Sequence, residues 1–452
     1  MSERKRIYLC LAHMSEDGME QKYIKEAFDT NWVVPLGPNV NGFENDLENF
    51  VNKIEGPADS QNHGLSKRVV ALSSGTAAVH LGLLAAGVKA GDEVIGQSFT
   101  FCASAHPVTY LGAKPVFVDS EPDTWNIDPD LMEEAIKDRI AKTGKAPAAI
   151  VPVALYGMPY KIDRIMEIAE KYGIPVVEDA AEGFASRYKG RVLGTFGKYG
   201  VLSFNGNKMI TTSGGGALIT ANEEEWREIM MYATQYRESY PYYQHEKIGY
   251  NYRMSNICAG IGRGQMTVVN AHLAHHKHVQ KMYEELLAGV PGITVHSQPV
   301  QGCFQPHRRC EGQGLMVNGE EVPVYDSNYW LCTITIDPKV KIKGQENAYK
   351  TVVKGAVGGA AGVIHMAESA TTDCQPNDNV EALRVVLDQA QVEARPLWKP
   401  MHKQPCYKDV PAYVNGVSEG LFKVGMCLPA GPYVSDEDVK YIVETIKNAI
   451  VG

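Results

Sequence analysis

Positive charge is scarce in this sequence of 452 residues. It has 44 lysines and arginines against 53 aspartates and glutamates, which gives a formal net charge of -9 at pH 7. Proteins that bind nucleic acids or membrane surfaces generally need a basic field to neutralise phosphate groups. The composition therefore argues against both classes of binder, although a few local arginines could still hold a small anionic ligand.

Long apolar runs are also missing. Near the N-terminus, a basic start is followed by an apolar stretch only from Ile7 to Ala12. That stretch is short for the hydrophobic region of a signal peptide and far short of a membrane span. We therefore predict no targeting segment, no transmembrane segment and no membrane partner.

Patterns typical of metal sites and disulfide frameworks are absent as well. The nine cysteines are odd in number and form no CxxC pair, which favours a reducing cytoplasm. Histidines stand at positions 272, 275, 276 and 278, and the first and third are one helical turn apart. Because no carboxylate or cysteine accompanies them, we predict the polar face of a long helix and no metal site.

From Arg68 onward, short β-branched runs alternate with helical patterns. The strand-like runs are residues 69–72, 93–96, 115–119, 149–155 and 174–179. This rhythm predicts an α/β domain with a largely parallel sheet and helices on both faces. In such sheets the ligand binds beyond the ends of the strands.

A single lysine stands where a further strand gives way to a glycine-rich loop. In VLSFNGNKMITTSGGGA, residues 201–217, Lys208 follows turn-forming asparagines and precedes the glycines at 214–216. A lysine on a rigid turn, partly shielded from water, can attack a carbonyl or an aldehyde. The alternative for Lys208 taken alone is an ordinary solvated surface charge.

Three of the predicted strands end in residues that suit ligand binding. Ser74, Gly75 and Thr76 lead into a helix, where free amides and hydroxyls can cradle a phosphate, although an ordinary N-terminal cap is an equally good interpretation. Phe101 follows the next strand, and core packing is the usual alternative for a single phenylalanine. Asp179 closes an apolar strand, where a buried carboxylate is costly unless a cation lies opposite it.

These four features together suit one cofactor. Pyridoxal 5'-phosphate (PLP) has a phosphate to be cradled, a flat ring to be stacked, a pyridinium nitrogen that pairs with an aspartate and an aldehyde that joins a lysine. The combination is far more specific than any one of its parts.

Several segments along the chain carry a family resemblance. They are SSGTAAVHLGLLAAGVKAGDEVI, QSFTFCASAHPV, VVEDAAEGFASRYKG, LSFNGNKMITTSGGGALIT, GYNYRMSNICAGIGRGQM and VEARPLWKPMHKQP. With them the chain resembles, nearly end to end, the DegT/DnrJ/StrS family of sugar-nucleotide aminotransferases. The resemblance implies fold type I of the PLP-dependent transferases, similar to aspartate aminotransferase, with a mixed, mostly parallel sheet in the large domain. We expect that domain, with an N-terminal arm, in residues 1–265, and a smaller C-terminal α/β domain in 266–452 with inserts near 301–325 and 338–378.

The resemblance also assigns roles by position. It implies that Lys208 forms the Schiff base with PLP, that Asp179 pairs with the pyridine nitrogen, and that Phe101 stacks on the cofactor ring. The implied phosphate contacts are Ser74, Gly75, Thr76 and Ser203, with Asn251 reaching the phosphate across a dimer interface. An obligate homodimer with shared active sites is therefore expected.

Glu182 departs from the family pattern, since many members have glutamine or histidine there. A hydrogen bond from this position to the cofactor's phenolic oxygen would need a protonated acid or a different partner. Relatives that dehydrate sugars replace the lysine with histidine, so the presence of Lys208 favours amino transfer.

The resemblance implies a particular reaction. An amino group would move from L-glutamate to a nucleotide-linked 4-keto-6-deoxy sugar, giving a 4-amino-4,6-dideoxy sugar nucleotide for surface polysaccharide or glycan synthesis. The segment EARPLWKPMH is most similar to members acting on such sugars, as in the perosamine and bacillosamine pathways. Candidate substrate contacts are Trp32, Arg237, Arg253, Arg395 and His402. A PLP-dependent sugar dehydratase and a catalytically silent binding or regulatory protein on the same fold stay open.

Overall fold

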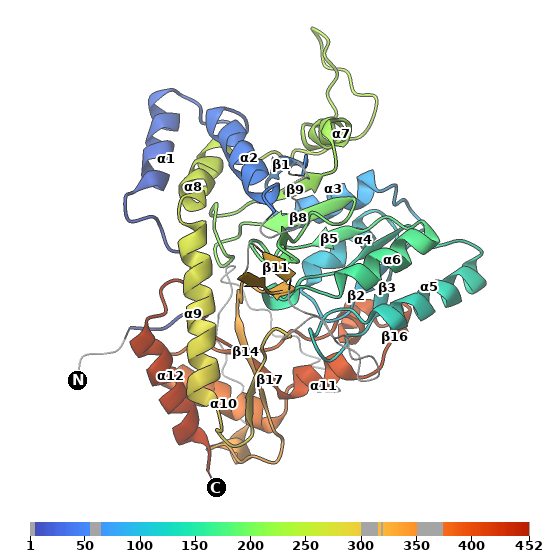
Figure 1. The fold of residues 1–452 in the computed structure, drawn as a ribbon. Helices are drawn as coiled ribbons and strands as arrows, with labels where there is room; N and C mark the ends of the chain where they lie inside the picture. Colours follow the sequence, from blue (N-terminus) through green and yellow to red (C-terminus); the bar gives the residue numbers. More distant parts are fainter. Residues whose placement is uncertain (1–4, 55–64, 300–314, 318–319, 350–373, 452) are drawn as a thin grey trace.

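The structure is a computed structural model that describes residues 5–54, 65–299, 315–317, 320–349 and 374–451. Figure 1 shows the arrangement of its elements. The helices are α1 (Met19–Asp29), α2 (Pro38–Val51), α3 (Gly75–Ala85), α4 (His106–Tyr110), α5 (Pro129–Thr143), α6 (Ile162–Tyr172), α7 (Glu223–Ala233), α8 (Asn256–Met266), α9 (Val269–Leu287), α10 (Asp378–Gln389), α11 (Val417–Val424) and α12 (Asp436–Ala449).

One large sheet lies at the centre of the first part of the chain. Its strands follow the order β1 (Arg68–Leu72), β9 (Gly216–Thr220), β8 (Tyr199–Ser203), β5 (Val177–Asp179), β4 (Ala149–Val151), β2 (Glu93–Gln97), β3 (Lys114–Val118) and β16 (Ala412–Tyr413). Isolated parallel β-bridges join the segments of β4 and β5. β9 runs antiparallel to β1 and β8, and the other neighbouring pairs are parallel. The prediction of a mixed, mostly parallel sheet is confirmed.

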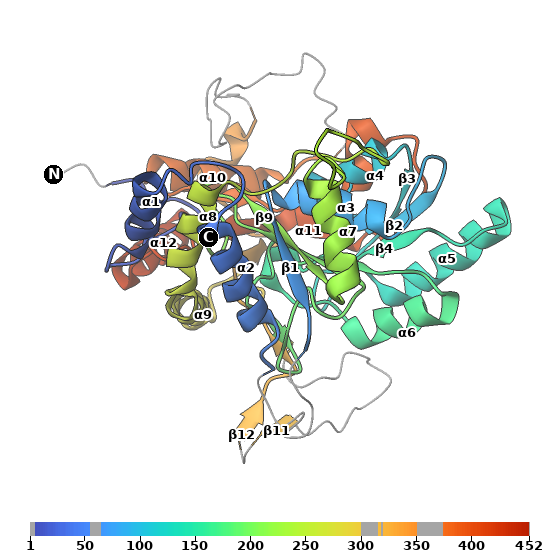
Figure 2. The same cartoon turned by 90° about the horizontal axis from the view of Figure 1, so that it is seen from above.

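Both faces of this sheet are covered by helices, because its strands are apolar on both sides. In β1, Val69 and Ala71 belong to the same buried cluster as residues of α2, α5 and α6, whereas the alternate residues Val70 and Leu72 share a cluster with residues of α3 and α7. This is the period of two that a strand imposes on its side chains. Figure 2 shows α3 and α7 lying together beside the strands.

A second core lies in the C-terminal part of the chain. The strands β10 (Ile293–Val295), β14 (Cys332–Ile336), β17 (Gly425–Leu428) and β15 (Arg395–Pro396) form an antiparallel sheet, against which α10 and α12 pack. α9 joins the two cores, since Val269 belongs to the first and Val279 to the second (Figure 1).

The predicted domain boundary at residue 265 falls just before α9 and remains a prediction. The C-terminal part is not confined to the second core, because β16 pairs with β3 at the edge of the large sheet. The predicted inserts at 301–325 and 338–378 lie largely outside the described residues. Short strands elsewhere are β6 (Arg187–Tyr188), β7 (Arg191–Val192), β11 (Leu315–Val317), β12 (Glu320–Val322) and β13 (Tyr325–Asp326).

Glycines allow α8 to lie unusually close to the two N-terminal helices. A Cβ at Gly262 would lie 2.7 Å from the ring of Phe43 in α2, and one at Gly264 would lie 2.5 Å from the backbone nitrogen of Glu20 in α1. A larger residue would push these helices apart. The sequence GIGRG therefore sets how tightly α1 and α2 pack.

A loop that follows α7, residues 235–250, projects from the body of the molecule (Figure 1). It carries Tyr242, Tyr243 and Ile248, which are 61%, 75% and 85% exposed. No helix in the described ranges is long and apolar enough to cross a membrane.

Candidate active site

The candidate residues meet at one edge of the large sheet. β1, β5 and β8 run in the same direction, so their carboxyl ends lie together. Ser74 follows β1, Asp179 ends β5 and Ser203 ends β8. Topology alone therefore brings together residues that are more than a hundred positions apart in the sequence.

Asp179 is a buried carboxylate, as predicted. It is 3% exposed, its Oδ2 accepts a hydrogen bond from Ser104 Oγ at 2.6 Å, and its Oδ1 accepts one from the amide of Ala181 at 3.0 Å. Burial raises the pKa of Asp179, while these two donors and the charge of Lys208 oppose the rise. A cationic group opposite this carboxylate would offset the cost of its burial.

Lys208 lies on a tight turn beside this aspartate. Its amide donates to the carbonyl of Asn205 at 2.9 Å, and its side chain is 13% exposed. The Nζ atom lies 3.6 Å from Glu182 Oε1 and 4.0 Å from the centre of the Trp330 ring. The alternative of a freely solvated surface lysine is therefore wrong.

Glu182 is 5% exposed, and its Oε2 accepts a hydrogen bond from the amide of Tyr156 at 2.8 Å. Burial raises the pKa of Glu182, and the nearby Lys208 charge opposes that rise. The nearby Trp398 indole N–H also lowers the pKa of Glu182, although its geometry is not that of an ordinary hydrogen bond. The Glu182 carboxyl group is thus buried and lies beside the Lys208 amine.

The turn between β1 and α3 lies against the end of β8. Ser74 caps α3, with its Oγ accepting from the amide of Ala77 at 3.0 Å, so the capping interpretation is confirmed. A Cβ at Gly75 would lie 2.9 Å from the Cβ of Ser203, so only glycine lets the start of α3 lie this close to the end of β8. With Thr76 in the first turn, the free amides of α3 remain available to an anion.

Phe101 is not part of the core. Its side chain is 55% exposed, and its ring packs edge-on against Trp398 at 6.4 Å between centroids. The core-packing alternative is wrong, and the ring is free to stack on a ligand.

The predicted substrate contacts do not form one group. Arg253 is buried and forms an ion pair with Glu44 at 2.5 Å, so its guanidinium links α2 to the end of β1 and is not offered to a ligand. Arg395 pairs with Glu393 at 2.7 Å. The interpretation of Arg253 as an available anion-binding group is corrected by its burial.

The other three candidates lie on loops around the edge. His402 Nδ1 lies 2.6 Å from Ser98 Oγ, and burial lowers the pKa of this histidine. Arg237 lies over the Tyr243 ring at 4.1 Å in the projecting loop, and Trp32 is 39% exposed. Asn251, expected to serve the partner's phosphate, is exposed at the base of that loop, paired with Thr234.

Two of the four histidines of α9 do not lie on a polar face, which corrects that prediction for them, whereas His275 is half-buried and His278 is exposed. His272 is 6% exposed and His276 is fully buried, and burial lowers the pKa of His276 to about 3. Their helix is covered on that side because it passes between the two cores. Within the described part of the chain, no group of three or more His, Cys, Asp or Glu side chains is placed to hold a metal.

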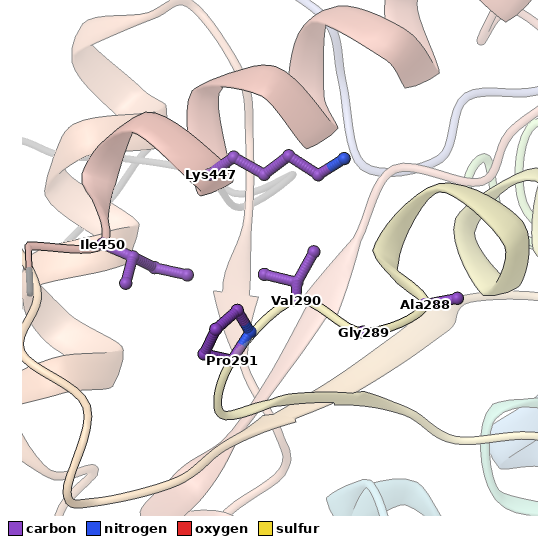
Figure 3. A pocket seen from close by; sticks show the side chains of 6 residues that line it. All are labelled: Ala288, Gly289, Val290, Pro291, Lys447 and Ile450. Atoms are coloured by element: carbon purple, nitrogen blue, oxygen red, sulfur yellow. The ribbon is translucent and has the colours of Figure 1, made fainter.

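Sequence reasoning missed several neighbours of the site, among them Ser104, Tyr156, Trp330 and Trp398. Ser104 lies three residues after Phe101 within the segment quoted above, and that proximity was the only available signal. Trp398 lies within the quoted segment EARPLWKPMH, whereas Tyr156 and Trp330 come from segments in which no local pattern marks them. A separate pocket between the ends of α9 and α12, shown in Figure 3, is lined by Ala288, Gly289, Val290, Pro291, Lys447 and Ile450 and includes none of the candidate residues.

Fold and site together define a PLP-dependent transferase of fold type I. The chain matches the DegT/DnrJ/EryC1/StrS aminotransferase family over residues 14–308 and 348–447, and it belongs to that family. It is 38% identical to EpsN of Bacillus subtilis, over 98% of this chain and 95% of that protein. It is 30% identical to GDP-perosamine synthase of Escherichia coli O157:H7, over 97% of this chain and 98% of that protein.

Solved structures agree on the fold. A DegT DnrJ EryC1 StrS aminotransferase from Brucella abortus superimposes with a TM-score of 0.74 at 24% identity, covering 96% of this chain and 95% of the other. The chain is thus an aminotransferase whose cofactor is PLP. The residues present fit that group, because Gly75 brings the start of α3 close to Ser203 at the end of β8, Phe101 offers an exposed ring, and Asp179 is a buried carboxyl group that a cation opposite it would stabilise.

Proposed function

We propose that this enzyme transfers an amino group from L-glutamate to a nucleotide-linked 4-keto-6-deoxy sugar. The observation that carries the proposal is the placement of Lys208, 13% exposed and beside two buried carboxyl groups at the edge of the sheet. Lysine at this position, where sugar-dehydrating relatives are expected to have histidine, favours amino transfer over dehydration.

Each residue has a role that follows from its surroundings. Bound PLP supplies an aldehyde that receives the amino group and a ring that takes up electrons from the donor. Lys208 moves the proton from the donor's α-carbon, since its side-chain amine can act as a general base. Asp179 holds a proton on the ring nitrogen, because its buried charge is stabilised by a cation opposite it.

The substrate proposal draws on the relatives. A GDP-perosamine synthase is similar over nearly the full length of the chain, and nucleotide sugars carry a diphosphate that needs cationic partners. Arg237 remains a cationic candidate for this task, His402 remains a candidate hydrogen-bonding contact, and the exposed Trp32 could cover the sugar. Arg395 stays a candidate if it exchanges Glu393 for the substrate.

We also propose a homodimer with shared active sites. The projecting loop exposes apolar side chains that a second copy would cover, and Asn251 stands at its base. Such a dimer would let Asn251 of each chain reach the partner's phosphate cradle.

The test is a two-stage reaction with purified, PLP-loaded protein. L-Glutamate alone should bleach the visible band of the cofactor, and one member of a panel of nucleotide-linked 4-keto-6-deoxy sugars should restore it while gaining one amino group by mass spectrometry. If glutamate leaves the band unchanged while another amino acid bleaches it, the donor is wrong. If no nucleotide sugar restores it, the acceptor is wrong.

A further inference from the structure

The charged end of Lys208 is held in an unusual way. Its Nζ lies 4.0 Å from the centre of the Trp330 indole ring and 3.6 Å from Glu182 Oε1. Among the described residues, this atom forms no hydrogen bond of ordinary length, although the side chain is largely buried. A ring face and a carboxylate therefore take the place of hydrogen-bond acceptors.

Trp330 also holds the backbone that carries the lysine. Its indole N–H donates to the carbonyl of Asn207 at 2.6 Å, immediately before Lys208. The Trp330 side chain is 2% exposed and belongs to an apolar cluster with Cys10 and Leu331, so it has little freedom to move. One indole thus fixes both the turn and the charged end of the lysine.

We propose that Trp330 is a positioning residue for Lys208, whose ring face holds the protonated Nζ at the place from which the lysine transfers its proton. The inference rests on the proposed function, which gives Lys208 that transfer. An aromatic face attracts an ammonium group electrostatically but presents no lone pair. The ring therefore holds the ammonium group in place without a conventional hydrogen-bond acceptor.

The position of Trp330 in the fold adds a consequence. It lies two residues before β14, the strand that pairs with both β10 and β17 in the second core. The lysine itself stands on the turn that follows β8. Its reacting atom thus lies against a side chain from a distant segment of the chain, the one that enters β14.

Fluorinated tryptophans test the ring face without changing its shape. Each fluorine weakens the negative face of the indole, so the protein is produced with tryptophan, 5-fluorotryptophan or a difluorinated analogue. In the PLP-free protein, acetic anhydride then labels lysines, and mass spectrometry compares Lys208 with Lys247. Lys247 is an internal control, because its Nζ lies over Tyr236 at 4.8 Å and over no tryptophan.

The second readout uses the PLP-loaded protein. It measures exchange of the α-hydrogen of L-glutamate with deuterium from the solvent, which reports proton transfer directly. The same series is made in Trp330→Phe, which has no indole over Lys208 and shows any effect of fluorine on the other tryptophans, Trp398 near Glu182 included. Trp226→Phe is the matched control, since Trp226 likewise donates to a backbone carbonyl, that of Val69 at 3.0 Å, and has Arg68 over its ring at 4.6 Å.

We expect each fluorine to raise the Lys208/Lys247 labelling ratio and to slow α-hydrogen exchange. Over the series these changes should reach about two- to thirtyfold, which is the interaction energy of a partly desolvated cation with an indole ring expressed as a ratio. Both trends should persist in Trp226→Phe and vanish in Trp330→Phe. A flat labelling ratio, or equal slopes with and without Trp330, would refute the inference. If wild-type protein exchanges no α-hydrogen of glutamate, the proposed function fails instead, and the labelling ratio still decides on Trp330.

Discussion

The phosphate cradle makes a prediction that separates cofactor binding from stability. In Gly75→Ala the new Cβ would lie 2.9 Å from the Cβ and 3.1 Å from the Oγ of Ser203. Ordinary contacts need several tenths of an ångström more, so the start of α3 must shift away from the end of β8. Inserting a methyl group into a packed site costs roughly 1–3 kcal/mol.

If this free-energy cost is added to the conformation of the turn that binds the phosphate, the affinity for PLP drops about five- to a hundredfold. Gly82→Ala is the matched control. Gly82 lies in the same helix as Gly75 but two turns from the cradle, and its new Cβ would meet Val177 Cγ1 at 3.1 Å. We expect both variants to lose stability in denaturant unfolding, and Gly75→Ala alone to lose PLP affinity.

The assay titrates the PLP-free protein with PLP and, in parallel, with pyridoxal, which lacks the phosphate. Gly75→Ala should weaken PLP binding and leave pyridoxal binding nearly unchanged. Equal losses for both ligands, or a loss of PLP affinity in Gly82→Ala as large as in Gly75→Ala, would show that the turn after β1 does not bind the phosphate.

Further predictions concern the buried charges. Burial raises the pKa of Asp179, so the cost of its charge is present above that raised pKa and disappears as the pH falls below the pKa of the unfolded chain. Asp179→Asn should therefore raise the Tm of the PLP-free protein at pH 7. In melting curves measured over a pH series, this gain in Tm should shrink toward about pH 4. A gain in Tm that grows on acidification would contradict this. In the loaded enzyme, the same variant should slow bleaching by glutamate roughly a hundredfold or more in stopped-flow traces. Arg253→Gln should cost about 3–5 kcal/mol of unfolding free energy by leaving Glu44 buried and unpaired, and Glu44→Gln added to it should recover part of that loss. A change in the KM for the nucleotide sugar without a loss of stability would instead return Arg253 to the substrate site.

Much of the architecture could be predicted from local patterns. The β-branched runs became the strands of the large sheet, because apolar segments of that length can be buried only in a sheet covered on both faces. Asp179 and Lys208 could be singled out because each is a costly residue type at a strand end or tight turn. Their burial follows from the fold that those same strands create.

Partnerships between distant side chains could not be predicted in the same way. Arg253 was a reasonable anion-binding candidate until the fold placed Glu44 against it, 209 positions away in sequence. The histidines of α9 suggested a polar face, but the helix passes between two cores and buries His272 and His276. Trp330, which lies over Lys208, comes from a segment more than a hundred positions away, just before β14. In each case the deciding contact depends on packing between elements, which no local pattern records.

The most direct measurement of the central claim is chemical trapping of the cofactor. PLP-loaded protein is reduced with borohydride, digested and mapped by tandem mass spectrometry. The account predicts one modified peptide, with the pyridoxyl group on Lys208, and loss of that peptide when L-glutamate is added before reduction. A pyridoxyl group on another lysine, or labelling of Lys208 that glutamate does not diminish, would contradict it.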